Sequence, residues 1–289
     1  MLLPFKNLGI IIVDEEHDAS YKQDDGVVYH ARDMAISRAS IENIPIHLIT
    51  SIPSIETFNN IQNKKFRHFK IIKRYNDFPL PKTKIVNLNI KKIKNNFIDL
   101  ETIKLVKFFL DKNEQVLFFL NRRGYAPYLI CKNCGYKQTC PNCSMYLTFH
   151  KNKNKAMCHH CSAEKKLFNK CKDGKICDFI MYGPGVEKIY EEVIKLFPTN
   201  KVEIFSSDYM KKKDQTNSLF NRIANNKVDI LIGTQMISKG FNFPKLNCIV
   251  VIDADFSGRG YDLRTTEKNI QLYHQLSGRA GRFSSESLI

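Results

Sequence analysis

Three pairs of cysteines, each pair separated by two residues, lie close together near the middle of this chain. A pair with this spacing bends the backbone so that two thiolates converge on one ion, and two such pairs supply the four ligands of a tetrahedral zinc site. Single cysteines follow at positions 171 and 177. The spacing predicts a zinc-binding module that the rest of the chain carries. The pairs are Cys131 and Cys134, Cys140 and Cys143, and Cys158 and Cys161.

Two other chemistries also use closely spaced cysteines. Structural disulfides need an oxidising compartment, and the short apolar run 8–13, followed at once by three acidic residues, is no export signal. A thioredoxin-like redox centre uses one such pair rather than three. Zinc is therefore the interpretation that fits the pattern.

The eight cysteines of the cluster divide into two sets. The inner set forms a complete four-thiolate site from Cys140, Cys143, Cys158 and Cys161. The outer set is Cys131, Cys134 and Cys171, and a further pair would place its fourth ligand at position 174, which is Gly174. Either Cys177 completes this site or the site stays incomplete, with His159 and His160 as possible substitutes.

The ninth cysteine, Cys248, lies in an apolar run outside the cluster, and we expect it to be an ordinary core residue.

Charge favours an anionic partner. The 289 residues hold 45 Lys and Arg against 29 Asp and Glu, a formal net charge of +16, and nucleic acid is the first candidate for such a chain. Part of this charge reflects a lysine-rich composition, and each four-thiolate zinc site subtracts about two charges. No apolar run approaches the ~18 residues of a membrane span, so we expect a cytoplasmic protein without a membrane partner.

Short runs rich in Ile and Val alternate with segments of helical spacing. This alternation predicts an α/β fold, a parallel sheet covered on both faces, which binds ligands beyond the carboxyl ends of its strands. The expected strands are 7–13, 46–50, 115–120, 202–205, 229–232 and 248–253. The expected helices are 31–41, 98–110, 186–197, 215–224 and 266–276.

One basic stretch interrupts this alternation. Residues 66–95 contain Pro79 and Pro81 and show no sustained period, so we expect a linker between two lobes. The lobes are then residues 1–65 and residues 96–289, and the cysteine-rich insertion at 131–177 belongs to the second.

An acidic pair and an arginine-rich turn stand at the ends of predicted elements. Asp14 and Glu15 follow a buried strand, where one carboxylate can hold Mg²⁺ and the next can polarise a water molecule. A solvated acidic cluster is the plainer interpretation. Near the other end, Gln275 precedes Arg279 and Arg282 on a small-residue turn, and such arginines stabilise charge on a transferred phosphoryl group.

Several stretches of the chain resemble the primosomal protein N′ (PriA) family of bacterial replication-restart helicases, members of helicase superfamily 2. The similarity extends from the first residues to about Arg282. The residues that carry it are 14–23, 29–33, 117–127 and 183–187, together with the cysteine cluster and the turn at 275–282.

The resemblance implies two RecA-like lobes, with ATP and Mg²⁺ between them and a zinc-binding insertion in the second lobe. The first lobe is then only its C-terminal part, residues 1–65. Asp14 and Glu15 match the residues for Mg²⁺ and for water activation, and His17 matches the residue that couples them to the DNA-contacting face. Gly240 and Gln275 match helicase motifs V and VI, in which Arg279 and Arg282 are the arginine-finger candidates.

The resemblance also implies partners. These are branched, forked or single-stranded DNA, primosome proteins and the single-stranded DNA-binding protein, with the protein itself a monomer. The segment 21–32 resembles a loop that senses DNA. Tyr21 and Tyr29 are its candidates for stacking on bases, and Arg32 for contact with the backbone, whereas a plainly packed loop is the alternative.

The chain departs from the family in ways that bear on activity. It contains no G-x-x-x-x-G-K-[ST] phosphate-binding loop, it has no counterpart of the family's N-terminal and C-terminal domains, and Thr50-Ser51-Ile52 stands where the family has Ser-Ala-Thr. Without that loop the β- and γ-phosphates have no anchor. We therefore expect little or no ATPase activity from this chain alone. A non-catalytic zinc module that binds branched DNA or docks primosome proteins is the alternative function.

Overall fold

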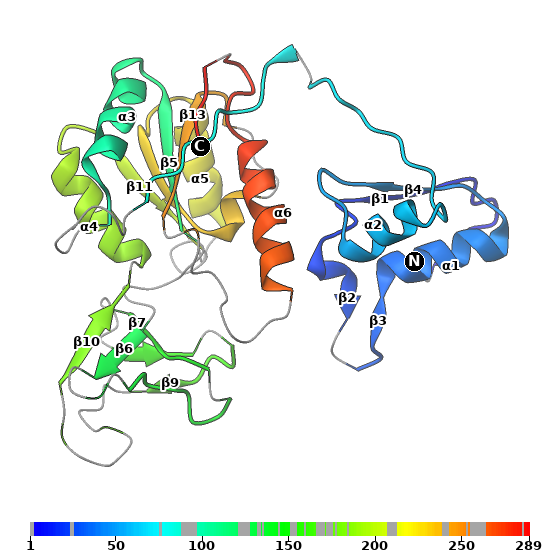
Figure 1. Ribbon diagram of the computed structural model, residues 1–289, viewed down its shortest axis with the longest axis horizontal. Coiled ribbons are helices and arrows are strands. Elements are labelled where there is room, and N and C mark those ends of the chain that lie inside the picture. Colours follow the sequence, from blue (N-terminus) through cyan, green and yellow to red (C-terminus); the bar gives the residue numbers. More distant parts are fainter. Residues whose placement is uncertain are drawn as a thin grey trace. The chain divides into compact units, whose positions relative to one another are not determined.

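The chain forms two compact units, Met1–Ile72 with Leu263–His274 and Lys73–Asp262 with Gln275–Ile289 (Figure 1). The expected boundaries at residues 65 and 95 remain predictions, and the first unit gains a segment from near the C-terminus that the sequence did not suggest. The computed structural model describes residues 3–23, 26–74, 77–87, 97–120, 128–131, 134, 136–143, 145–150, 155–158, 160–165, 171, 176, 178–183, 185–206, 213–238, 243–252, 254, 264–284 and 286–289.

The second unit contains a four-stranded parallel sheet. Its strands lie in the order β11 (Val202–Phe205), β12 (Ile230–Gly233), β5 (Gln115–Phe119) and β13 (Leu246–Val251). The central strand β5 is buried along its whole length. A strand covered on both faces reads as a continuous apolar run, and the predicted α/β fold is confirmed.

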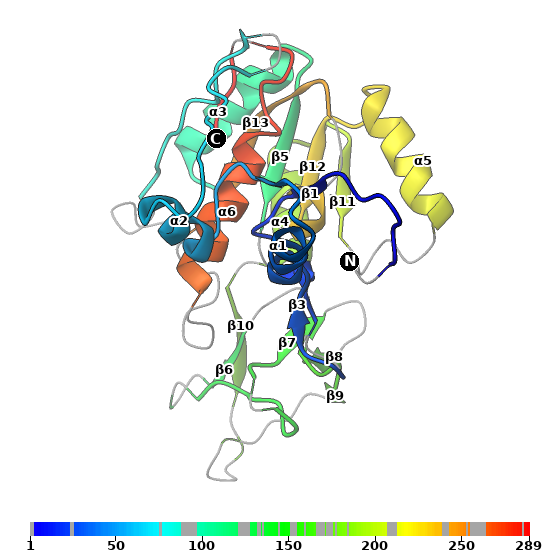
Figure 2. The ribbon, with the colours of Figure 1, turned by 90° about the vertical axis from the view of Figure 1, so that its right-hand side faces the viewer.

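Helices cover both faces of this sheet. Helices α3 (Leu100–Asp111) and α4 (Val186–Leu196) pack against one face around Val116 and Phe118, and α5 (Lys213–Ala224) lies across the sheet from them (Figure 2). In α4 the buried Val186, Ile189 and Val193 recur at intervals of three and four residues, the spacing that places apolar side chains on one helix face.

The last residues of the chain lengthen the sheet at the β13 edge. Ile249 N–H donates to the Leu288 carbonyl, and Lys82 N–H donates to the Ser287 carbonyl, each at 2.9 Å. Leu288 therefore lies between β13 and Lys82 and pairs in parallel with both. These bonds satisfy backbone groups that an open sheet edge would otherwise expose.

The cysteine-rich insertion forms small antiparallel sheets of its own. Strand β6 (Tyr128–Cys131) pairs with β10 (Phe179–Tyr182), and β7 (Thr148–His150), β8 (Lys155–Met157) and β9 (Glu164–Lys165) form a three-stranded sheet. A core this small buries too little apolar surface to stabilise a separate module. Its buried side chains are Leu129, Leu147, Phe149 and Ala156, together with Cys140 and Cys158.

The first unit has a two-stranded parallel sheet. Strand β1 (Ile11–Asp14) pairs with β4 (Ile46–Ile49), and α1 (Ala31–Glu42) packs against both strands. Three buried side chains, Val13, Ala35 and Ala39, face this interior. The remaining elements are η1 (Ala19–Tyr21), the hairpin strands β2 (Lys22–Gln23) and β3 (Tyr29–His30), α2 (Ile55–Gln62) and the first part of α6 (Thr265–Ser277).

The sequence predicted most of these elements but not all. The expected strand 202–205 is confirmed to the residue, and the other expected helices and strands have counterparts with shifted ends. Helix α2 was missed. It begins at the N-cap Ser54, whose hydroxyl accepts a hydrogen bond from Thr57 N–H, and none of the expected helices covers these residues. None of the helices in the described part of the chain combines the length and apolarity needed to span a lipid bilayer.

Gly281→Ala should destabilise the second unit. Gly281 has a φ of +63°, and a Cβ at this position would lie 2.2 Å from Ser287 Oγ. We expect the free energy of unfolding to fall by about 2 kcal/mol or more, measured by urea unfolding followed by circular dichroism. Gly26→Ala is the control, since it has a φ of +72° but no neighbour within 4 Å. An equal loss in both variants would contradict the predicted clash.

Candidate functional site

Two carboxylates stand at the carboxyl end of β1. Asp14 is exposed, and the Glu15 side chain is 41% exposed. Glu15 adopts a left-handed conformation with a φ of +48°, and its N–H donates to Asp14 Oδ1 at 2.9 Å. The sharp turn aims the second carboxylate away from the direction of the strand. The two carboxylates predicted from the sequence are thus adjacent and accessible.

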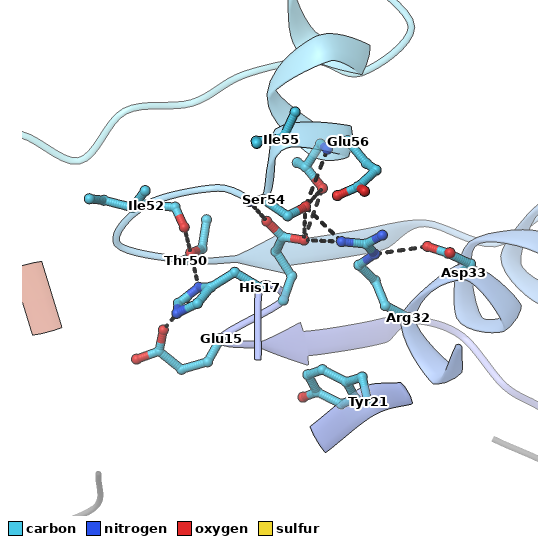
Figure 3. A network of polar contacts seen from close by, with 12 residues as sticks. Glu15, His17, Tyr21, Arg32, Asp33, Thr50, Ile52, Ser54, Ile55 and Glu56 are labelled. Carbon is cyan, nitrogen blue, oxygen red and sulfur yellow. Dashed lines mark hydrogen bonds and ion pairs between the residues drawn. The ribbon is translucent and has the colours of Figure 1, made fainter. Parts of the chain in front are cut away.

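His17 connects this acidic turn with the end of the neighbouring strand. Its Nδ1 lies 2.7 Å from Thr50 Oγ1 and 3.5 Å from Glu15 Oε2 (Figure 3). The Thr50 hydroxyl donates its proton to the Ile52 carbonyl at 2.7 Å. Thr50 Oγ1 must then accept from His17, which places a proton on Nδ1. Glu15, His17 and Thr50 thereby form one continuous polar chain.

The helical turn η1 and a short hairpin follow the acidic turn, and of the two predicted aromatic residues Tyr21 ends η1 and Tyr29 lies in the hairpin. The Tyr21 hydroxyl donates to the Asp14 carbonyl at 2.7 Å, and Tyr29 is half-buried in β3. Burial, followed by the charges of Asp14, Asp18 and Glu15, raises the pKa of Tyr21 above its ordinary value. Between the hairpin strands, Val27 and Val28 are exposed.

Arg32 lies in the interior of the first unit, at 5% exposure. Its guanidinium donates to Glu16 and to Asp33, at 2.9 and 2.8 Å. Burial opposes the charged form, but the hydrogen bonds and charges of Asp33 and Glu16 outweigh it and raise the pKa of Arg32. The predicted contact of Arg32 with a DNA backbone is at odds with this burial, because the guanidinium faces protein carboxylates instead of solvent.

Glu16 is the residue of this site that the sequence analysis missed. It is fully buried although Glu15 before it is partly exposed, and four hydrogen bonds reach its carboxylate. Three acidic residues follow one another after the strand, and the sequence alone does not show which of them is buried. In β1 the buried Val13 stands between exposed neighbours. This alternation does not extend through the turn at Glu15, so it could not have predicted that Glu16 is buried.

The first turn of α2 also meets the first turn of α6. Ile55 N–H donates to Glu267 Oε1 at 2.9 Å, and Arg264 donates to Glu56. The hydrogen bond from Arg264 lowers the pKa of Glu56 despite the opposing effect of burial. Segments far apart in the sequence are therefore joined at the start of α2.

Arg279 and Arg282 lie on the turn that follows α6, in the second unit. Arg279 N–H donates to the Leu276 carbonyl at 2.9 Å, and Arg282 Nε donates to the Gly278 carbonyl at 3.1 Å. Arg74 contacts the same turn at the carbonyls of Gly278 and Ala280. Burial and then the charge of Arg282 lower the pKa of Arg74. Gln275 is half-buried near the end of α6, and Gly240 lies outside the described residues.

The cysteines gather as the spacing predicted. The sulfurs of Cys140, Cys143, Cys158 and Cys161 lie within 4.8 Å of one another, and so do those of Cys131, Cys134 and Cys171. Either group could hold a metal ion. Cys177 and His159 lie outside the described residues, so the fourth ligand of the outer group stays a prediction. Cys248 is buried in β13, and burial followed by the charge of Glu114 raises its pKa to about 12.

The inner thiols differ in how readily they ionise. Burial opposes ionisation of Cys140, but backbone N–H groups at Asn142 and Cys143 lower its pKa to about 7. Cys143 accepts a similar bond at Met145, yet burial and the neighbouring thiols raise its pKa to about 12. Cys140 therefore ionises more readily than Cys143, and its negative charge opposes ionisation of the thiols beside it. A bound divalent cation would offset this repulsion.

Comparison with known proteins identifies the family. A model of the helicase conserved C-terminal domain matches residues 152–284. The replication restart protein PriA of Rickettsia felis is 44% identical over 291 aligned residues, which cover 100% of this chain. PriA of Haemophilus influenzae is 39% identical and PriA of Bacillus subtilis 34%, each over 96% of this chain. The chain belongs to the PriA family.

The match covers only part of each PriA relative. It takes in 45% of the Rickettsia felis protein, 38% of the Haemophilus influenzae protein and 35% of the Bacillus subtilis protein. The chain thus spans less than half the length of these relatives. Among solved structures, Saccharomyces cerevisiae Dbp5 bound to RNA and ADP BeF3 aligns with 99% of this chain and 54% of its own, at 11% identity and a TM-score of 0.44, a likeness too weak to carry an argument.

Thr50→Val should destabilise the first unit of this PriA-type chain. Valine keeps the shape of threonine but removes the hydroxyl that bonds both His17 Nδ1 and the Ile52 carbonyl. We expect a loss of about 1–2 kcal/mol in the free energy of unfolding, measured by urea unfolding. Thr50→Ser keeps the hydroxyl and is the control, and a valine variant as stable as the serine variant would contradict the predicted bonds.

Proposed function

We propose that this chain is the central part of a PriA-type ATP-dependent DNA helicase that acts in primosome assembly and in the restart of stalled replication forks. The observation that carries the proposal is the identity with PriA proteins along the whole chain. Because the chain spans less than half of those relatives, the activity belongs to a longer protein or to an assembly with further segments. A cytoplasmic location and a monomeric state are part of the proposal.

ATP and Mg²⁺ would be bound by residues at the ends of the elements described above. Asp14 is an exposed carboxylate at the end of β1 and suits Mg²⁺, which prefers oxygen ligands. Glu15, next to it, would orient and deprotonate a water molecule. We assign to His17 the coupling of these carboxylates to Thr50, based on its contacts with both Glu15 and Thr50.

By their match to the family's motifs, residues of the second unit are also proposed to act on the nucleotide. Arg279 and Arg282 would stabilise negative charge on the transferred phosphoryl group. Gln275, near the end of α6, and Gly240 would contribute to nucleotide binding. The contact of Arg74 with the arginine turn supports a fixed backbone there.

We propose zinc as the metal of the cysteine groups. Zinc is commonly bound by four thiolates in structural sites, and the four inner sulfurs lie within 4.8 Å of one another. The outer group requires Cys177 or another ligand to reach four. A metal in these groups would stabilise an insertion whose apolar core is small.

DNA is the proposed partner of the hairpin. Tyr29 lies on it and Tyr21 directly precedes it, and the basic charge of the chain favours a polyanion. Forked, branched or single-stranded DNA would be the substrate, with primosome proteins and the single-stranded DNA-binding protein as further partners.

The alternative is a non-catalytic zinc module that binds branched DNA or docks primosome proteins. The observation that favours it is the absence of a G-x-x-x-x-G-K-[ST] motif from the 289 residues. For this chain alone, the two proposals differ in whether nucleotide affects DNA binding.

Removal of one inner ligand should lower the metal content. We expect Cys143→Ser to lose one zinc ion per chain relative to the unaltered protein, measured by elemental analysis of the purified chain. Cobalt substitution should give thiolate-to-metal charge-transfer bands that weaken in the same variant. Cys248→Ala is the control, because this buried cysteine lies outside both groups. Unaltered protein free of zinc and unable to bind cobalt would contradict the metal assignment.

Binding to labelled forked DNA, followed by fluorescence anisotropy, tests the function. We expect Tyr29→Ala to weaken binding about tenfold, since a stacked base contributes ~1–3 kcal/mol. The slope of affinity against salt should stay unchanged, because no phosphate contact is removed. No binding by the unaltered chain would contradict a DNA-dependent function.

Nucleotide then separates the two candidate functions. A helicase fragment should change its DNA affinity when ATP and Mg²⁺ are added, and a zinc module should not. We expect this chain alone to hydrolyse little or no ATP. Clear DNA-stimulated hydrolysis that Glu15→Gln abolishes would contradict that expectation and establish a complete nucleotide site.

A further inference from the structure

Arg74 is the second residue of the second unit and lies in the stretch that the sequence predicted to be a linker. Its side chain is half-buried, and in the described part of the chain its hydrogen bonds all go to backbone carbonyls. Nη1 donates to the Pro79 carbonyl at 2.8 Å, and Nη2 lies 3.4 Å from the Gly278 carbonyl oxygen and 3.3 Å from that of Ala280. A guanidinium carries its donors in a fixed fork and can hold several acceptors at once. Arg74 thus joins its own segment to the turn that follows α6.

The two turn carbonyls that Arg74 contacts belong to peptide groups that are also bonded through their nitrogens. The first peptide group carries the Arg279 N–H, which donates to the Leu276 carbonyl at 2.9 Å. The second carries the Gly281 N–H, which donates to the Leu246 carbonyl at 3.2 Å. A planar peptide group bonded at both its oxygen and its nitrogen cannot rotate without breaking a bond. Arg279 lies between these two groups, so bonds that Arg74 completes fix the backbone from which its side chain extends.

The contact depends on carbonyl acceptors rather than on an ion pair. Arg282 Nε donates to the same Gly278 carbonyl at 3.1 Å, and burial followed by the charge of Arg282 lowers the pKa of Arg74. Gly278 directly follows α6, and the last carbonyls of a helix lack partners within the helix and carry partial negative charge. Ala280 is fully buried, which keeps water from its carbonyl. Carbonyls with these needs offset the repulsion between the two arginines.

The segment that carries Arg74 is itself anchored to the second unit. Lys82 N–H donates to the Ser287 carbonyl at 2.9 Å, Ile289 N–H donates to the Lys82 carbonyl at 2.8 Å, and Lys84 N–H donates to the Ile289 carbonyl at 2.9 Å. Arg74 therefore acts from a segment with a fixed backbone, which a flexible linker would not provide.

We propose that Arg74 is a positioning residue that fixes the backbone of the arginine turn, residues 278–282, and thereby sets the direction in which Arg279 and Arg282 present their charge. The statement about the backbone rests on the contacts of Arg74 alone. The statement about the use of that charge rests on the proposed function, in which both arginines act on the nucleotide.

Hydrogen–deuterium exchange of the full chain, resolved by mass spectrometry, tests the statement about the backbone. Arg74→Met removes the donors but keeps a long side chain. We expect the amides of residues 278–282 to exchange about tenfold faster in this variant, as for the loss of a charged hydrogen-bond donor. Lys84→Met is the matched control, because it removes an exposed ion pair with Glu101 from the same segment and should leave exchange in the turn unchanged.

A core variant separates positioning from general stability. Val106→Ala truncates a fully buried side chain of α3 and should destabilise the whole second unit. If the turn opens locally, its opening does not involve Val106, and exchange of residues 278–282 should stay as in the unaltered chain.

The statement about charge needs a readout of the arginine side chains. Phenylglyoxal modifies accessible guanidinium groups, and peptide mass spectrometry gives the rates at Arg279 and Arg282 separately. With ATP and Mg²⁺ at about twice the dissociation constant for ATP, both rates should fall about threefold in the unaltered chain and in Lys84→Met. Arg74→Met should lose this protection, and Arg74→Lys, which keeps a charged donor, should recover it.

Three outcomes would overturn the inference. They are unchanged exchange of the turn in Arg74→Met, an equal acceleration of the turn in Val106→Ala, and protection of both arginines by ATP that persists in Arg74→Met. If ATP protects neither arginine in the unaltered chain, the proposed nucleotide role of the turn fails, while the exchange rates still decide whether Arg74 fixes its backbone.

Discussion

Coverage of the parallel sheet on both faces is the constraint on which the second unit depends. Strand β5 has neighbours on either side and helices above and below it, so every one of its residues is buried. The strands run in one direction, and the loops after them meet at one edge. Polar residues such as Ser206 and Thr234 follow β11 and β12 at that edge. The apolar interior thus fixes where chemistry can take place.

The first unit and the cysteine-rich insertion have too little apolar surface to form a core of this kind. Polar side chains and thiols make part of their interior contacts instead. In the first unit the few buried apolar side chains are supplemented by Glu16, Arg32 and Ser54, which bond across three segments. In the insertion, thiols converge where a larger core would otherwise be needed. Such interiors depend on directional bonds, and they fail sharply when one partner is removed.

This difference explains how far the sequence alone could lead. The sequence predicted the parallel sheet and its helices from apolar runs such as 115–120 and from helical spacing such as that of 186–197. The local pattern of apolar residues is enough to indicate these elements. The cysteine spacing likewise predicted which sulfurs gather. The start of α2 was missed because a capping serine after a proline also suits a turn. The burial of Arg32 could not be read from its neighbours, because Asp33 is adjacent but its buried partners Glu16 and Ser54 lie 16 and 22 positions away.

The left-handed turn at Glu15 carries a cost. A glutamate with a φ of +48° occupies a region that L residues other than asparagine and aspartate rarely enter. Its conformation costs about 1 kcal/mol or more relative to glycine. Glycine would relieve the turn but remove the carboxylate, so stability and the proposed water activation make opposite demands on this one position.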